Sequence, residues 1–361
     1  MIIAARPYPN IPTLFSGVKP FRSPGTLFYP MGRDALMSGL LALGLKKGDY
    51  IIVPAYMCYS SLSPLESHGF ELVYLDVAPD LSFCAQSLIE TAERVSAKAL
   101  LIVHYFGFLQ KIEPIAQVCE SLNIKLVEDF SHSFLSQPPS NSSMHSHAQI
   151  FSMRKSLPVL DGGALKLNNK NKDSYIEHLA CISLISDGIY ILKRLVEKTL
   201  ILLRINIYAR WINSSRKRYL SNNHYILNIT PCQPSWQLSR YLSSPEYLNY
   251  IKTQVDKNFK QLSKNLRTLG FEPLFDAPKD GEVPQALVLR DTTGKMVEYL
   301  RAHGVGAWCW PAEEAPHSLL NNPQQYPNAY YHNQTLVLLP IHQNIGKRQI
   351  DYMTQVLSNW Q

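Results

Sequence analysis

The stretch Leu126-Val127-Glu128-Asp129-Phe130-Ser131-His132 decides the fold, because it reads as an apolar strand that ends in carboxylates and closes a regular series. Short apolar strands and amphipathic helices alternate ahead of it, with strands expected at 50–54, 71–76, 99–104 and 125–129 and helices at 34–45, 59–68, 86–95 and 111–122. This alternation predicts βαβ units and a mostly parallel sheet. Ligands of such sheets gather at the carboxyl ends of the strands, where His104 and Asp129 both fall.

A second pattern follows about twenty residues later. Ser152 and Lys155 precede the double glycine Gly162-Gly163. Together with Asp129, these residues match the needs of pyridoxal phosphate (PLP): the acid keeps the pyridine nitrogen protonated, and the lysine amine forms a Schiff base. Each residue alone has a simpler interpretation, with Asp129 as a cap, Lys155 as a solvated lysine and His132 as a packed histidine.

PLP also carries a dianionic phosphate, which a helix N-terminus binds well. Gly32 allows close approach to the backbone where a helix is predicted to begin, and Arg33 opens that helix. Ser152 could add a hydroxyl group to the same phosphate. Cys58 and Tyr59, in the turn after the next strand, could lay a thiol or a ring over the cofactor, although core packing is the alternative for such side chains.

Size and composition indicate a globular protein of two lobes. The chain has 361 residues, 46% of them hydrophobic and 17% charged. We expect a PLP-binding large domain at 1–235 and a small C-terminal α+β domain at 236–361, with short strands at 286–289, 307–310 and 335–339. The net charge of +7 is mild and suits an anionic small substrate or a membrane surface. No nucleic-acid-binding module is recognisable, so no nucleic-acid partner is expected.

The cysteine pattern and the N-terminus favour a cytoplasmic protein. The six cysteines contain no CxxC pair, which argues against a metal site or a disulfide framework and fits a reducing compartment. Residues 1–7 are too short and too proline-broken for a signal peptide. No run of eighteen uncharged apolar residues could span a bilayer.

The least ordinary segment is a basic helical region at 174–218. Its cations are Lys193, Arg194, Lys198, Arg204, Arg210, Arg216, Lys217 and Arg218, and Glu197 is the only acid between 191 and 218. The simplest interpretation is an amphipathic helix packed on the large lobe. The functional alternatives, for residues 189–218, are binding of a substrate diphosphate and peripheral contact with anionic lipid.

In this order, the motifs resemble those of the DegT/StrS-type (DegT/DnrJ/EryC/StrS) sugar aminotransferases, which are fold-type I PLP enzymes. Arg33 stands where the family's Gly-Thr-x-Ala-Leu motif has threonine, and the spacing from Ser152 to Lys155 is tighter than in most members, which points to an outlying subgroup. The segments that carry the resemblance are 32–36, 48–54, 69–76, 104–107, 128–132, 152–163, 326–329 and 339–342.

The resemblance implies an aspartate-aminotransferase-like large lobe and roles for single residues. Lys155 would bind PLP covalently and move a proton between substrate and cofactor carbons. Asp129 would pair with the pyridinium nitrogen, and His132 would lie near the ring and its phenolic oxygen. The phosphate ligands would be Gly32, Arg33 and Ser152. Members form homodimers in which an Asn-x-Arg segment completes the partner's site; the equivalent stretch at 228–236 lacks that arginine and leaves Asn228 as the candidate.

We therefore expect a PLP-dependent aminotransferase that moves an amino group, from glutamate, onto a nucleotide-linked keto sugar in surface-glycan or secondary-metabolite biosynthesis. Two alternatives remain. Sugar dehydratases of this class replace the Schiff-base lysine with histidine, so Lys155 argues against that reaction. A non-catalytic PLP-fold protein that binds or regulates a partner would have no physical need for both Asp129 and Lys155.

Overall fold

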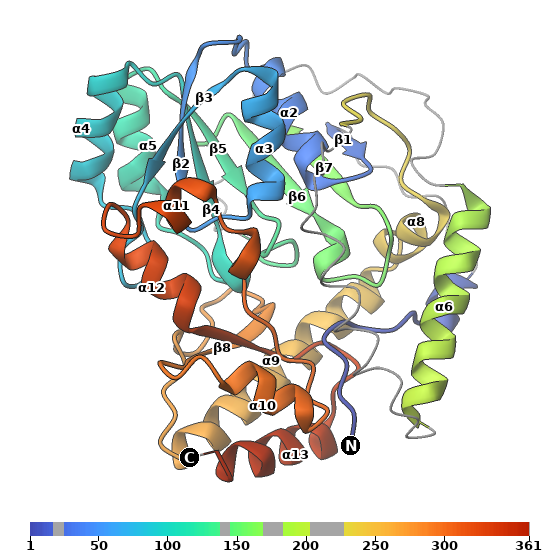
Figure 1. Ribbon diagram of the computed structural model, residues 1–361. Helices are drawn as coiled ribbons and strands as arrows, with labels where there is room; N and C mark the ends of the chain where they lie inside the picture. The colour runs from blue at the N-terminus through green and yellow to red at the C-terminus, as the bar shows by residue number, and fades with distance from the viewer. Residues whose placement is uncertain (17–24, 138–144, 169–182, 203–226, 361) are drawn as a thin grey trace.

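The computed structural model describes residues 1–16, 25–137, 145–168, 183–202 and 227–360 of the chain. Its larger lobe is built on a seven-stranded sheet in the order β1-β7-β6-β5-β4-β2-β3 (Figure 1). The strands β3, β2, β4, β5 and β6 are parallel, whereas β7 and β1 are antiparallel to their neighbours. The strand bounds are Thr26–Tyr29 (β1), Tyr50–Pro54 (β2), Glu71–Leu75 (β3), Ala99–Val103 (β4), Lys125–Asp129 (β5), Ala148–Ser152 (β6) and Gly163–Leu167 (β7).

Helices cover both faces of this sheet, as expected for βαβ units. Alternate residues of the central strands point to opposite faces, so Leu100 and Leu126 pack with α4 and α5, whereas Leu101 and Val127 pack with α2 and α3. The helix bounds are Gly32–Ala42 (α2), Tyr59–His68 (α3), Ala85–Val95 (α4) and Ile112–Ser121 (α5). The predicted strands and helices of residues 34–129 are confirmed to within two or three residues at their ends.

The smaller lobe contains a two-stranded antiparallel sheet of β8 (Ala286–Arg290) and β9 (Leu336–Pro340). One face of this sheet packs with the helices below it, and the other face joins the core of the large lobe, so the two lobes share apolar contacts. The helices of the C-terminal part are α8 (Trp236–Leu242), α9 (Pro245–Thr268), α10 (Met296–Ala302), α11 (His317–Asn321), α12 (Pro327–Thr335) and α13 (Lys347–Ser358).

The predicted strand at 307–310 is wrong. Only Trp308 pairs with Leu338, by two backbone hydrogen bonds. The Trp310 carbonyl accepts from the Tyr56 hydroxyl instead of from β9, and the chain turns at Pro311 into the 3₁₀ helix η4 (Ala312–Glu314).

The boundary at 235/236 remains a proposal, because the N-terminal residues belong spatially to the smaller lobe. A short helix, α1 (Ile11–Leu14), follows them. The Ile3 amide donates to the carbonyl of Gly304 at 2.7 Å, and the Tyr8 amide donates to Asn344 Oδ1 at 2.7 Å. Both termini lie at the lower end of the molecule in Figure 1.

Within the predicted basic helical region, the structure describes one helix, α6 (Leu184–Leu202). Residues 174–182 and 203–218 lie outside the described residues. Among the described cysteines, Cys58, Cys84, Cys119 and Cys309 are not disulfide-bonded. Cys232 is disulfide-bonded, which differs from the expectation of unpaired cysteines.

Candidate active site

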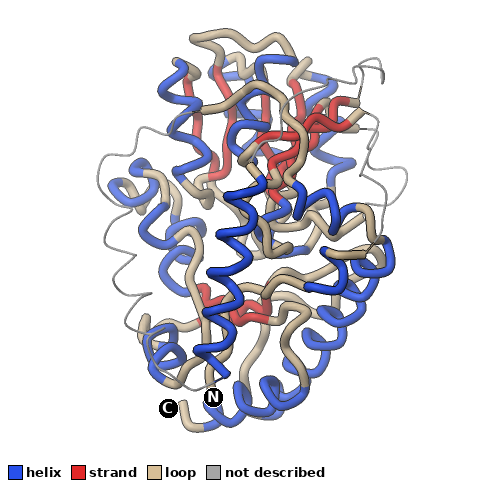
Figure 2. The backbone as a smooth tube through the Cα atoms, turned by 90° about the vertical axis from the view of Figure 1, so that its right-hand side faces the viewer, coloured by secondary structure: helices blue, strands red, loops and turns tan. Residues whose placement is uncertain are grey.

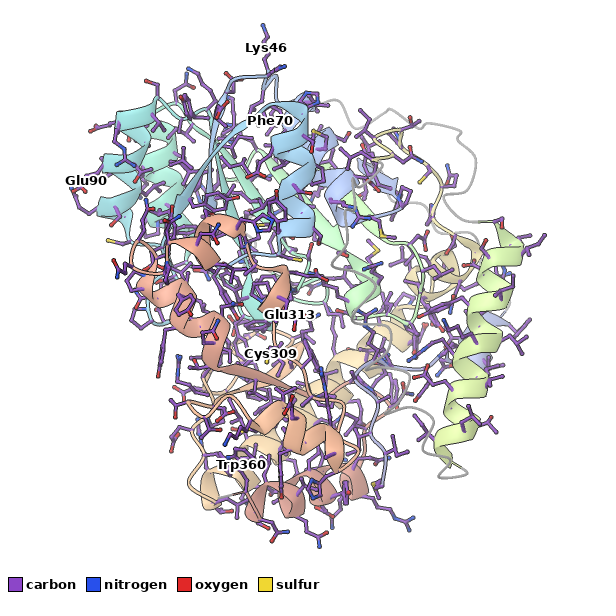
Figure 3. The ribbon with its side chains drawn as sticks, viewed as in Figure 1. Lys46, Phe70, Glu90, Cys309, Glu313 and Trp360 are labelled. Carbon is purple, nitrogen blue, oxygen red and sulfur yellow. The ribbon has the colours of Figure 1, made fainter. Side chains whose placement is uncertain are left out.

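A cavity of about 520 Å³ lies where the carboxyl ends of the parallel strands face the smaller lobe. Its walls come from parts of the chain that are far apart in sequence. Figure 3 labels Cys309 and Glu313, two of its lining residues, at the level where the lobes meet. Seven of the predicted site residues line it: Gly32, Arg33, Cys58, Asp129, His132, Ser152 and Lys155.

Asp129 stands at the end of the central strand β5, in register with Val103 and Ile150 on its two neighbours. The Ser131 amide donates to its Oδ1 at 2.7 Å and fixes the buried carboxylate. Glu128, one residue earlier, points to the opposite face, because side chains alternate along a strand. There Glu128 Oε2 lies 2.9 Å from Nε2 of buried His104.

His104 is therefore a structural residue and not a ligand at this edge. Its Nδ1 accepts a hydrogen bond from the Gln110 amide at 3.0 Å, so the proton lies on Nε2 and points at Glu128. Its carbonyl accepts from the Ser133 hydroxyl at 2.8 Å, which ties the loop after β5 to the end of β4.

Lys155 ends a 3₁₀ turn, η3 (Met153–Lys155), that continues directly from β6. The half-buried side chain faces the cavity, with Nζ 5.8 Å from the centre of the Trp310 ring. Burial lowers the pKa of this amine, and the Asp129 carboxylate opposes that shift. A lysine whose pKa is lowered loses its proton more readily, as a carbonyl-binding amine must.

The glycine pair shapes the loop that holds Lys155. Gly162 has φ +123°, and the Met153 amide donates to its carbonyl at 2.8 Å. A Cβ on Gly163 would lie 2.1 Å from the carbonyl oxygen of Met31, so only glycine lets this strand pass the start of α2.

His132 lies between two aromatic rings over the cavity. Its ring stacks on Phe106 at 5.2 Å between centroids and meets the edge of Trp310 at 4.4 Å. Burial holds the pKa of His132 well below its usual value, and the Lys155 charge acts in the same direction. The imidazole is therefore neutral. Its buried Nδ1 has no hydrogen-bond partner among the described residues, so it can pair with a ligand.

The start of α2 forms a cradle beside these groups. A Cβ on Gly32 would meet Ser152 Cβ at 3.2 Å and Ser131 Oγ at 3.4 Å, so two hydroxyl-bearing residues close around this glycine. The first amides of a helix have no intrahelical acceptor and favour anions. Asp34 does not compete, because its carboxylate accepts hydrogen bonds from the amides of Met31 and Asn228.

The residues present therefore fit PLP. The cradle at Gly32 suits its phosphate, Asp129 its pyridine nitrogen and Lys155 its carbonyl carbon. Nδ1 of His132, which has no hydrogen-bond partner among the described residues, could form a hydrogen bond with the cofactor. The residues that would hold the cofactor are Gly32, Arg33, Asp129, His132, Ser152 and Lys155.

Two further predicted contacts, Tyr59 and Asn228, do not line the chain's own cavity. Tyr59 opens α3 on the side away from it: the hydroxyl donates to Glu66 at 2.9 Å and the ring packs on His317. Asn228 is exposed, and its side-chain oxygen accepts from the Thr230 amide at 3.2 Å. Neither residue lines the cavity, although Asn228 lies beside the start of α2.

Cys58 does line the cavity, with a partner that the sequence did not indicate. Its Sγ lies 2.9 Å from Glu314 Oε2 and 2.9 Å from Ser60 Oγ. Burial and the neighbouring Glu314 raise the pKa of the thiol to about 11. Cys58 is thus a protonated hydrogen-bond donor and not a nucleophile.

Trp310 and Glu314 are the residues that sequence reasoning missed. They come from a loop about 150 residues after Lys155, and no local motif marks them. The Tyr56 hydroxyl donates to the Trp310 carbonyl and anchors this loop to the end of β2.

A buried polar network behind the lysine loop fixes the chain that enters the second lobe. Asp161 is fully buried and accepts hydrogen bonds from both the amide and the hydroxyl of Ser235, each at 2.8 Å. Asp187 on α6 accepts from the Gln237 amide at 3.1 Å. Burial raises the pKa of Asp161 to about 6, and the Ser235 hydrogen bonds only partly offset this shift.

This network gives a stability prediction for Asp161→Asn. Because the folded-state pKa lies above the unfolded value, ionisation of Asp161 between pH about 4 and 6 destabilises the native state. The asparagine cannot ionise and keeps an acceptor for Ser235. The unfolding free energy of the variant minus that of wild type should therefore rise by up to about 3 kcal/mol as the pH goes from about 4 to about 7. Urea denaturation at both pH values tests this; an equal difference at the two would contradict it.

Comparisons with known proteins find aminotransferases. Residues 30–190 match the model of the DegT/DnrJ/EryC1/StrS aminotransferase family. Over 99 residues, the chain is 35% identical to the 3-oxo-glucose-6-phosphate:glutamate aminotransferase of Bacillus subtilis, a match that covers 27% of this chain and only 22% of that relative.

Solved structures share the fold over almost the whole chain. Spr1654 from Streptococcus pneumoniae, in its PMP form, superposes with a TM-score of 0.71 at 14% identity and covers 99% of this chain and 97% of its own. PseC of Helicobacter pylori, an aminotransferase involved in pseudoaminic acid biosynthesis, superposes with a TM-score of 0.65 at 15% identity over 92% and 85% of the two chains. The predicted fold class is confirmed. Over residues 30–190, the chain is similar to the DegT/DnrJ/EryC1/StrS aminotransferase family.

Proposed function

We propose that the protein is an aminotransferase that uses PLP to move an amino group from glutamate to a keto sugar carried on a nucleotide. The observation that carries the proposal is the convergence of Lys155, Asp129 and the neutral His132 in one cavity. When bound, PLP supplies a carbonyl carbon that reacts with amines and a ring that withdraws electrons from the substrate carbon.

The protein's own residues would supply binding and proton transfer. Lys155, with its lowered pKa, gives and takes protons at the substrate carbon. Asp129, fixed by the Ser131 amide, holds a proton at the ring nitrogen. His132 Nδ1 offers one hydrogen bond to the ring substituents, and Trp308, Cys309 and Trp310 line the cavity on the side of the smaller lobe.

The sugar part of the proposal rests on the relatives. The Bacillus subtilis relative acts on 3-oxo-glucose-6-phosphate with glutamate as the other substrate, according to its name. Besides Arg33, which would hold the cofactor phosphate, the cavity walls carry Arg6, Arg154 and Arg301, a set of cations that suits a phosphorylated sugar. A role in surface-glycan or secondary-metabolite biosynthesis, in the cytoplasm, follows as part of the same proposal.

We further propose a homodimer. The cavity of a single chain contains neither Tyr59 nor Asn228, and Asn228 is exposed, as a residue that reaches a partner's site must be. Light scattering of the purified protein tests this; a monomer at all concentrations would contradict it.

The test of the proposed reaction is a half-reaction. Adding glutamate to the PLP-loaded protein should convert its visible spectrum to that of the PMP form and release one equivalent of 2-oxoglutarate. An unchanged spectrum with glutamate, glutamine and aspartate would reject the aminotransferase. Release of water from a sugar substrate would instead favour the dehydratase.

His132 gives a milder prediction. His132→Ala should lower kcat about tenfold, because it removes a hydrogen bond and the ring that stacks on Phe106 without removing the electron-withdrawing ring. His132→Gln keeps an N–H donor and should restore part of the loss. Steady-state kinetics of the two variants measure this, and equal losses would show that packing alone matters at this position.

A further inference from the structure

The outer face of α6 is an exposed apolar surface. Of the twelve large hydrophobic side chains that are exposed in the described part of the chain, five lie on this one helix. Single exposed apolar residues are common, but a contiguous group marks a contact surface. Their exposed fractions are 70% for Leu184, 76% for Ile185, 63% for Ile189, 63% for Leu192 and 50% for Val196.

The spacing of these residues keeps them on one side. Ile185, Ile189, Leu192 and Val196 follow each other at intervals of four, three and four, which is one stripe of a helix. A Cβ added to Gly188, beside this stripe, would meet no atom within 4 Å. The helix forms the right-hand edge of the molecule in Figure 1, the side that faces the viewer in Figure 2.

The inner face of α6 contacts the rest of the protein, and these contacts hold the helix in place without any contribution from the outer apolar stripe. Arg194 donates to the carbonyls of Arg6 at 3.2 Å and Pro7 at 2.9 Å, and its guanidinium lies 4.7 Å from the centre of the Tyr8 ring. It also pairs with Glu197. Asp187 accepts from the Gln237 amide.

The charge on the helix indicates what covers the stripe. Glu197 is paired and Asp187 is buried, so the exposed charges of α6 are those of Lys193 and Lys198. Lys193 lies one turn after Ile189 on the same side. A second copy of the chain would bring the same positive face against it, whereas an anionic surface is complementary. Apolar side chains flanked by lysines are the pattern of helices that lie in a lipid interface.

The cavity does not account for this face. None of the described residues 184–202 lines it, so Lys193 and Lys198 are not substrate-diphosphate ligands of their own chain's cavity. Nor does the helix cross a bilayer: among the described helices, none has the length and hydropathy to do so.

We propose that the outer face of α6, formed by Leu184, Ile185, Ile189, Leu192, Lys193, Val196 and Lys198, docks the protein on an anionic lipid surface. The apolar stripe enters the headgroup region and the lysines reach lipid phosphates. Because Arg194 ties the helix to Arg6 and Pro7, which line the cavity wall, docking would bring the active site close to the membrane. The inference concerns binding and does not depend on the proposed reaction.

Co-sedimentation of the PLP-loaded full chain with vesicles tests it. We expect binding to phosphatidylcholine vesicles that contain phosphatidylglycerol, weakening with added salt, and little binding to pure phosphatidylcholine. Lys193→Glu with Lys198→Glu should lower the partition coefficient roughly thirtyfold or more. Ile189→Ser with Leu192→Ser should lower it roughly tenfold or more. The matched control is Lys257→Glu with Lys264→Glu, on the exposed side of α9, which should change it little.

Two results would overturn the proposal. One is a partition coefficient that the α6 substitutions do not lower more than the α9 control substitutions do. The other is a difference in molar mass between wild type and the Ile189/Leu192 variant in lipid-free solution, because a second copy of the chain would then cover the stripe. Transamination of soluble substrate by the α6 variants should stay at the wild-type level, which separates failure of docking from failure of the reaction.

Discussion

Lys155→Ala is expected to lower kcat by about 10⁴-fold while the protein stays folded and still binds PLP. The side chain faces the cavity and forms no hydrogen bond with the described residues, so its loss removes chemistry more than packing. The matched control is Lys166→Ala, because Lys166 is the nearest lysine in the following strand and is exposed on β7. Steady-state kinetics and far-UV circular dichroism of both variants make the comparison.

Covalent labelling provides a readout that does not depend on turnover. Borohydride reduction of the PLP-loaded wild type, followed by peptide mapping, should place the pyridoxyl mass on Lys155. A label on Lys166, or on no lysine, would remove the central residue of the proposed mechanism. Retained activity in Lys155→Ala would do the same.

The parts of the fold that were predictable are those encoded by local patterns. The apolar strands at 50–54 and 125–129 and the helix at 59–68 are read from residue spacing, because each must bury one face within a few residues of chain. The close packing at Gly32 was predictable for a similar reason, since a Cβ there would lie 3.2 Å from Ser152 Cβ; phosphate binding at this place stays a prediction.

What could not be predicted depends on contacts between distant segments. His104 and Asp129 end neighbouring strands, yet the alternation of side chains sends His104 to Glu128 on the other face. Trp310 and Glu314 reach the cavity only because the smaller lobe folds back, and nothing near them in sequence says so. The expected strand at 307–310 is wrong because the Trp310 carbonyl accepts from the hydroxyl of Tyr56, 254 residues away, and so does not pair with β9.

Because side chains alternate along β5, Asp129 and Glu128 lie on opposite faces of the sheet, and the same substitution at both positions tests the role of Asp129. Asp129→Asn should lower kcat by about 10³-fold, because the neutral amide can still accept the Ser131 hydrogen bond but cannot stabilise a positive charge on the ring nitrogen. The loss should appear in kcat more than in PLP affinity, since the cradle at Gly32 would hold the phosphate in both proteins.

Glu128→Gln is the matched control for that change. It is the same replacement of acid by amide, one residue earlier in the same strand, but on the face where Glu128 meets His104. The glutamine oxygen can still accept from His104, so this variant should keep kcat within about threefold of wild type, even if its stability falls. If both variants lost activity equally, the carboxylates of β5 would act through the strand's integrity. If only Asp129→Asn lowers kcat, the charge of Asp129 acts on the cofactor bound in the cavity.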